Sequence, residues 1–261
     1  MSELRAVAAA FTFMTRLPLG RFASHDETEL RASAAYFPLV GVVVGAFGAA
    51  TYAIATTLWP LSIAILLSMI AMVYVTGAFH EDALADTLDG FGGGRTSDRV
   101  LEIMKDSRVG SFALVGVALT LAVKFAALSS IAGSAGTVGL VRALVGGHVL
   151  ARWSSVPLMM TLSYVRPAST NERPSAGGPF SSALGVSRGL AATVFAAAAV
   201  DIALGANDAA MAAIVAVLVT ATAGLWFKTR IGGITGDTLG AANQLVEIAV
   251  YLVIVAVDRA L

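Results

Sequence analysis

The stretch from Leu61 to Asp89 reads L-S-I-A-I-L-L-S-M-I-A-M-V-Y-V-T-G-A-F-H-E-D-A-L-A-D-T-L-D, an apolar run that becomes acidic at its end. Its first part, Leu61–Phe79, is mostly apolar and has about the length, roughly 20 residues, that a helix needs to cross a bilayer. If the helix continues without a break, Asp82, Asp86 and Asp89 follow at intervals that place them on one stripe. The stretch therefore predicts a membrane-spanning helix with a carboxylate stripe at its end.

The composition indicates a chain that faces lipid over much of its surface. Hydrophobic residues make up 57% of the 261 residues, charged residues make up only 13%, and the mean hydropathy is +0.81. An ordinary soluble domain is about a quarter charged. The formal net charge of zero gives no indication of nucleic-acid binding. The absence of cysteine excludes disulfides, thiolate metal sites and cysteine nucleophiles.

Further apolar runs of span length occur along the chain. Together with Leu61–Phe79 they make seven candidate spans, and the others are Ala35–Leu58, Ser111–Ile131, Val138–Leu162, Gly189–Leu204, Ala209–Phe227 and Gly240–Val257. Turn-forming residues separate neighbouring runs at Pro60 and at Gly133–Gly136. The sequence therefore predicts an all-α, polytopic helical membrane protein with about seven transmembrane helices, forming a single integral membrane domain over residues 1–261.

The polar segments between these runs predict the orientation. They are Arg16–Arg31, His80–Gly110, Tyr164–Arg188 and Lys228–Thr238. Seven spans put all four segments on one side, and the connections on the other side contain no lysine or arginine. The positive-inside rule then predicts a multi-pass protein of the cell (inner) membrane, with its N-terminus and its acidic catalytic loops in the cytoplasm.

The carboxylate stripe is the strongest functional signal. Like charges at this spacing repel one another, so the stripe, with Glu81 on its flank, needs a positive partner. Hard carboxylate oxygens select Mg²⁺, Mn²⁺ or Ca²⁺. A solvated acidic helix end is the simpler alternative, but acidic residues that face the bundle at a membrane helix end usually mark a site. We therefore predict a metal site formed by Glu81, Asp82, Asp86 and Asp89.

A glycine-rich and basic segment follows the stripe. Gly90 and Gly92–Gly94 are expected to end the helix and to form a flexible loop whose N–H groups approach phosphate oxygens, although a plain helix stop explains them equally well. Thr96 can cap a short helix that reaches about Lys105. The cations of this segment are Arg95, Arg99, Lys105 and Arg108. Structural pairing or lipid-headgroup contact is the simpler explanation for at least half of its charges.

A second polar group opens the last apolar run. Asp237 stands at its start, and Asn243 and Glu247 share a face at a spacing of four residues. A glutamate inside a membrane helix is costly unless it is paired or bound to metal, and an interhelical polar contact is the simpler explanation. His148 and Arg152 share a face of the fourth run and are expected to face the bundle interior.

The two groups together resemble the cobalamin synthase family, membrane enzymes also called adenosylcobinamide-GDP ribazoletransferases. The matching elements are Arg16-Leu17-Pro18, His80-x-Asp82-x-x-x-Asp86-x-x-Asp89-Gly90-Phe91-Gly92-Gly93, Glu102-Ile103-Met104-Lys105-Asp106-Ser107-Arg108-x-Gly110 and Thr235-Gly236-Asp237-x-x-Gly240-Ala241. One departure is Ala83, where the family is expected often to have glycine. Because alanine preserves the helix, this departure is not expected to change the chemistry.

The resemblance implies an Mg²⁺-dependent reaction in which α-ribazole or its 5′-phosphate attacks adenosylcobinamide-GDP. GMP leaves, and adenosylcobalamin or its 5′-phosphate forms. Asp82, Asp86, Asp89 and Asp237 would be catalytic, with Asp237 either an additional metal ligand or the base for the ribose hydroxyl. The residues assigned to substrate binding are Arg16, Gly92, Gly93, Arg95, Lys105, Asp106, Arg108, Asn243 and Glu247. Displacing GMP from a pyrophosphate requires charge neutralisation on its oxygens and alignment of the nucleophile, which a carboxylate-held metal can supply.

Two other classes of protein stay open. A CDP-alcohol phosphotransferase also sets an aspartate-rich helix at the cytoplasmic face, but Gly93-Gly94 stands here where its motif has Ala-Arg. A secondary transporter would use the acidic groups for ions, and it predicts internal repeats and helices broken near mid-membrane. The chain has no convincing repeat. The expected partners are the two small-molecule substrates and the lipid bilayer, and the sequence leaves a homo-oligomer open.

Overall fold

Helices form every regular element in the part of the chain that the structure describes. This computed structural model describes residues 3–23, 27–165 and 184–260. The α-helices are α1 (Glu3–Met14), α2 (Glu27–Ser33), α3 (Phe37–Ala55), α4 (Leu61–Thr76), α5 (Phe79–Gly93), α6 (Ser97–Ile103), α7 (Ser111–Thr161), α8 (Val186–Leu204), α9 (Ala206–Ile231) and α10 (Gly236–Ala260). Two short 3₁₀ helices, η1 (Gly20–Phe22) and η2 (Ala34–Tyr36), precede α3. The all-α prediction is confirmed.

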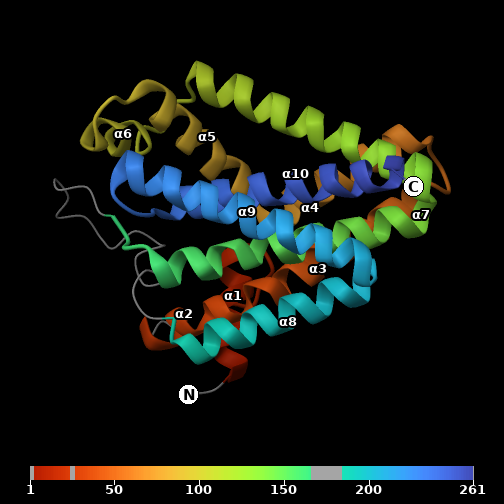
Figure 1. The fold of residues 1–261 in the computed structure, drawn as a ribbon, viewed down its shortest axis with the longest axis horizontal. Helices are drawn as coiled ribbons and strands as arrows, with labels where there is room; N and C mark the ends of the chain where they lie inside the picture. The colour runs from red at the N-terminus through yellow and green to blue at the C-terminus, as the bar shows by residue number, and fades with distance from the viewer. Residues whose placement is uncertain (1–2, 24–26, 166–183, 261) are drawn as a thin grey trace.

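Five of the described helices are long and apolar enough to cross a membrane, and a sixth span results if the bent pair of α4 and α5 counts as one. The 51 residues of α7 are more than twice the length that a bilayer requires. Gly136 breaks this helix with a φ of 64° and a ψ of −164°, and the two arms run in opposite directions across the molecule (Figure 1). The break confirms the turn predicted at Gly133–Gly136. The total of seven spans stays a prediction.

The connections between helices gather at two opposite ends of the bundle. α6 and the connection from α9 to α10 lie at one end, on the left in Figure 1. The break in α7 and the connection from α8 to α9 lie at the other end. This arrangement agrees with the predicted grouping of two polar segments, His80–Gly110 and Lys228–Thr238. Most of a third segment, Tyr164–Arg188, lies outside the described residues, and so do its Arg166 and Arg173.

Small residues let α3 pack directly on the second arm of α7. A Cβ atom at Gly41 would lie 2.3 Å from the His148 carbonyl oxygen, and one at Gly45 would lie 2.7 Å from that of Leu144. Close backbone approach of this kind stabilises helix pairs in lipid, where van der Waals packing replaces the hydrophobic drive. The packing leaves His148 and Arg152 buried in the bundle, as the sequence predicts.

The acidic helix is not a straight continuation of the preceding span, and that expectation is wrong. α4 ends at Thr76, and α5 begins at Phe79 after a bend of 86°. Gly77 and Ala78 both have a positive φ, of 70° and 58°. Glycine adopts this conformation freely, whereas alanine does so at a cost of roughly 1–2 kcal/mol. The bend turns the whole carboxylate stripe into a new direction while keeping it on one helix.

Candidate active site

The carboxylate stripe lies on α5, which packs closely against α10. A Cβ atom at Gly240 would lie 2.4 Å from the Ala83 Cβ atom, so the two helices approach each other closely here. Asp82 is exposed, while Asp86 and Asp237 are partly buried. Asp237 repels Asp86, and Asp82 repels both of them. The structure therefore brings together carboxylates from two helices that are far apart in the sequence.

Neighbouring carboxylates oppose the charge of Asp86. Asp237, Asp82 and Asp89 each repel it. Within the described residues, no group of three or more acidic or histidine side chains stands close enough to hold a metal ion as the side chains lie. The chemistry of the donors nevertheless suits a hard divalent cation, because a cation offsets the repulsion between carboxylates.

Two of the four predicted metal ligands have protein donors as partners. Asp89 accepts hydrogen bonds from the N–H groups of Gly110, at 2.6 Å, and Ala113, at 2.9 Å, where α7 begins. Glu81 Oε1 accepts a hydrogen bond from Gln244 Nε2 at 3.0 Å. These contacts give both carboxylates a structural role whether or not a metal ion binds nearby.

An open surface cavity of about 450 Å³ lies at the end of the stripe. Its lining includes four of the predicted site residues, Asp89, Gly93, Asp106 and Arg108. Arg108 donates to the Asp106 carboxylate from its Nε at 2.9 Å and from its backbone N–H at 3.0 Å. These hydrogen bonds lower the pKa of Asp106 from 3.8 to about 2, so the pair is ionised at neutral pH. An anion in this cavity could therefore bind to Arg108, which Asp106 holds in place.

The predicted glycine loop is largely helical, and the expectation of a flexible loop from Gly90 onward is wrong. α5 continues to Gly93, and Gly94 is the first residue outside it. Arg230 donates from NH2 to the carbonyl oxygens of Phe91 and, at 2.8 Å, of Gly94. Because these carbonyls lie at the helix end and lack helical partners, the arginine stabilises the end of α5. Arg230 is not among the predicted site residues, since no local pattern in the sequence links it to α5.

The remaining basic residues of the prediction lie on the surface. Arg95 and Lys105 are exposed, and so is Gly92 on α5. Arg16 is also exposed, and its guanidinium carbon lies 5.8 Å from the ring centroid of Tyr74. Thr96 caps α6 as predicted, accepting a hydrogen bond from the Arg99 N–H at 3.4 Å.

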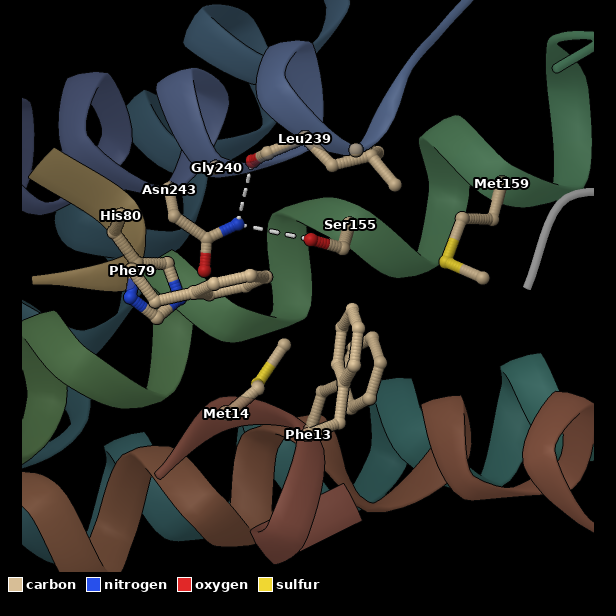
Figure 2. Close-up of a pocket in the computed structure, with 11 residues that line it drawn as sticks. Phe13, Met14, Phe79, His80, Ser155, Met159, Leu239, Gly240 and Asn243 are labelled. Carbon is tan, nitrogen blue, oxygen red and sulfur yellow. Dashed lines mark hydrogen bonds between the residues drawn. The ribbon is translucent and has the colours of Figure 1, made fainter. Parts of the chain in front are cut away.

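Asn243 points into the bundle, not toward the acidic surface. Its Nδ2 donates to the Leu239 carbonyl oxygen at 2.8 Å and to Ser155 Oγ at 2.9 Å (Figure 2). Its Oδ1 is buried without a hydrogen-bond partner, and so is the Nε2 of His80. Both residues line a cavity of about 20 Å³, which has room for about one water molecule. Asn243 therefore joins α10 to α7 through buried hydrogen bonds, and its predicted role in substrate binding stays a prediction.

Glu247 lies in a buried cluster of charged side chains. Lys124 Nζ is 3.0 Å from its Oε1, Arg152 NH1 is 3.6 Å from its Oε2, and the Tyr251 hydroxyl donates to Oε1 at 3.1 Å. The side chains of Glu247, Lys124 and Arg152 are each no more than 5% exposed. Glu247 thus makes the interhelical polar contacts that are the simpler explanation for a glutamate inside a membrane helix.

The fold and the site define a class of protein: a polytopic helical membrane protein in which carboxylates from two helices gather at one end. Residues 6–255 match the model of the family described as cobalamin-5-phosphate synthase, and the chain belongs to this family. An adenosylcobinamide-GDP ribazoletransferase from Leptothrix cholodnii is 40% identical over 251 residues, which cover 96% of this chain and 94% of the relative. A protein of the same name from Shewanella frigidimarina is 40% identical over 260 residues, or 98% of this chain and 96% of the relative. No solved structure matches the chain.

Proposed function

We propose that this chain is an adenosylcobinamide-GDP ribazoletransferase of cobalamin biosynthesis. A ribose hydroxyl of α-ribazole, or of its 5′-phosphate, forms an ester bond to the corrinoid-linked phosphate of adenosylcobinamide-GDP. The pyrophosphate bond breaks, GMP leaves with the bonding electrons, and a base takes the hydroxyl proton. Membership of the family and the names of relatives that align over nearly the whole chain support this reaction.

The observation that carries the chemistry is the negative field around Asp86. Three other carboxylates, those of Asp237, Asp82 and Asp89, repel its charge. Left alone, this arrangement is unfavourable, because like charges at these spacings repel one another. A site of this kind becomes favourable when a divalent cation or a cation-bound phosphate enters it.

We assign Mg²⁺ binding to Asp82 and Asp86, with Asp237 across from them on α10. Glu81 and Asp89 lie at the edge of this proposed Mg²⁺ site. Each already accepts a hydrogen bond from the protein, so each has less capacity to bind the ion. When bound, Mg²⁺ would neutralise charge on the pyrophosphate oxygens and stabilise GMP as the leaving group. Arg108, together with the exposed Arg95 and Lys105, would hold phosphate oxygens at the open cavity.

Asp237 has two candidate roles, which one variant separates. As a ligand, its change to asparagine would raise the Mg²⁺ concentration needed for half-maximal rate and leave the maximal rate within a few-fold. As the base, the same change would lower the maximal rate by about 10²–10⁴-fold at saturating Mg²⁺, the usual contribution of a positioned base. Asp201, exposed on α8, gives the matched Asp→Asn control.

The test of the function is a direct assay of GMP release. The purified protein in liposomes is incubated with adenosylcobinamide-GDP and α-ribazole, with and without Mg²⁺. Stoichiometric GMP and corrinoid product that require Mg²⁺ are expected. Absence of GMP from folded protein under all divalent cations would overturn the proposal.

The transporter alternative has one point in its favour, since the bend at Gly77–Ala78 is a helix break of the kind that transporters use. Vesicles that contain the protein would then take up a solute without releasing GMP. The assay above separates the two outcomes, because GMP forms only if a covalent bond is exchanged.

We also propose that the acidic end faces the cytoplasm of an inner membrane. The chain contains no cysteine, so single cysteines report accessibility cleanly. Lys105→Cys should react with a membrane-impermeant thiol reagent only after the cells are opened, and Asn207→Cys should react in intact spheroplasts. The reverse pattern would invert the proposed orientation.

A further inference from the structure

A chain of hydrogen bonds links the acidic helix to the buried charge cluster. Glu81 Oε1 accepts from Gln244 Nε2 at 3.0 Å, and Gln244 Oε1 accepts from Lys124 Nζ at 2.9 Å. Lys124 in turn lies 3.0 Å from Glu247. Gln244 therefore bridges Glu81 on α5 and Lys124 of the cluster on α7 and α10 through two hydrogen bonds.

The orientation of Gln244 is set by the groups on either side of it. Lys124 can only donate, so the amide oxygen of Gln244 must face the lysine and its NH₂ group must face Glu81. Gln244 is 2% exposed, and Lys124 is 4% exposed. Charged groups inside a membrane bundle are costly, and they persist where they serve a site. This pair fixes the direction in which Glu81 accepts its hydrogen bond.

The cluster itself is not a substrate site. Its cavity has a volume of about 20 Å³, enough for about one water molecule. Three buried polar atoms beside it have no hydrogen-bond partner: Glu81 Oε2, Arg152 Nε and Glu247 Oε2. A single water molecule could satisfy such groups, whereas neither reactant of the proposed reaction fits. The cluster therefore acts on other side chains of the protein and not on the substrate.

One face of α10 carries three residues that interact with the acidic helix. Asp237, Gly240 and Gln244 follow at intervals of three and four residues, so they share a face. Gly240 allows the close approach at Ala83, and Gln244 holds Glu81. Successive residues of a helix differ by about 100° in direction. Fixing Glu81 therefore fixes the directions of the carboxylates that follow it on α5.

We infer that Gln244 is a positioning residue, which orients α5 through Glu81 so that Asp82 and Asp86 face Asp237, with Lys124 as its anchor. This inference rests on the proposed function. It adds that part of the machinery lies inside the bundle, on side chains that do not touch the substrate. A displacement of about 1 Å at a catalytic group can cost about 100-fold in rate.

The test compares Gln244→Met and Gln244→Asn with the wild type in the GMP assay. Methionine has a similar length but cannot bridge the two charges, and asparagine keeps the amide but is one methylene too short. We expect kcat to fall by about 10- to 100-fold for both, the Mg²⁺ concentration for half-maximal rate to rise, and the KM for α-ribazole to stay within about twofold. Ser68→Ala removes another buried interhelical hydrogen bond, to the Gly48 carbonyl oxygen, and should leave all three values unchanged.

A double-mutant cycle with Glu81→Met, which has a similar length but no oxygen to accept from Gln244 Nε2, decides whether Gln244 acts through Glu81. If it does, adding Gln244→Asn to Glu81→Met costs little more than Glu81→Met alone, because the two changes break the same contact. Additive losses, or an unchanged Mg²⁺ dependence in folded Gln244→Asn protein, would overturn the inference. Loss of GMP release by the wild type would instead count against the proposed function itself.

Discussion

Gly240 on α10 faces Ala83 on α5 so closely that a Cβ atom on the glycine would come within 2.4 Å of the alanine Cβ atom. Gly240→Ala should therefore push α5 away from α10 and separate Asp86 from Asp237. Overpacking of this kind costs about 1–3 kcal/mol of stability. We expect a lower Tm in detergent and a loss of GMP release that exceeds the loss of folded protein.

Ala83→Gly supplies the compensating change for this prediction. The double variant Gly240→Ala with Ala83→Gly exchanges the methyl group between the two helices and should recover most of the GMP release. Glycine in the helix costs about 0.5–1 kcal/mol, so recovery of the Tm should be incomplete. A double variant as inactive as Gly240→Ala would show that the separation of the helices is not the cause.

Removing one charge at Asp86 should have opposite effects with and without Mg²⁺. Without a divalent cation, Asp86→Asn should raise the Tm, because it removes repulsion from Asp237, Asp82 and Asp89. With Mg²⁺ at about 100 times its Kd, the wild type should gain about 2.7 kcal/mol and the variant much less. Thermal unfolding in EDTA and in Mg²⁺ measures both effects. A Mg²⁺-dependent gain of equal size in Asp86→Asn would exclude Asp86 as a ligand.

The pair of Asp106 and Arg108 predicts a pH dependence in the acid range. Hydrogen bonds from Arg108 lower the pKa of Asp106 from 3.8 to about 2 in the folded protein. As the pH falls, Asp106 binds its proton at a higher pH in the unfolded state than in the folded state. The pair therefore stabilises the fold above the unfolded pKa and loses this effect as the pH falls through the folded pKa. The difference in Tm between the wild type and Arg108→Gln should be constant above pH 3.8 and disappear toward about pH 2. Because the pair is exposed, the difference should be small and should shrink in high salt.

The sequence predicts those features that depend on local pattern. The apolar runs predict the helices, the small residues at Gly133–Gly136 predict the break in α7, and the aspartate spacing predicts a stripe on one helix. Each follows from periodicity or from residues that favour turns. These predictions extend to Asp237, which opens the last helix as expected.

The features that the sequence does not predict depend on contacts between distant segments. Gly77 is a local signal for the end of α4, but nothing in the residue type marks Ala78 for a φ of 58°, so the sequence does not predict the sharp bend before α5. The contact between Glu81 and Gln244 joins residues 163 positions apart. Arg230 holds the end of α5 from 136 residues away, which is why the glycine run stays helical instead of forming a loop. Tertiary contacts of this kind override local propensity.

Asp89 should behave as a helix cap, in contrast to Asp86. Its two oxygens accept from the N–H groups of Gly110 and Ala113, which lack helical partners because they lie at the start of α7. Asp89→Ala should therefore lower the free energy of unfolding by about 1 kcal/mol, the usual value of such a cap, to the same extent in EDTA and in Mg²⁺. Asp89→Asn should lose less, since its amide oxygen still accepts one hydrogen bond. Thermal unfolding of both variants beside Asp86→Asn measures the difference. If Asp89→Ala left stability in EDTA unchanged but abolished the gain from Mg²⁺, Asp89 would be a metal ligand, and α7 would not depend on it.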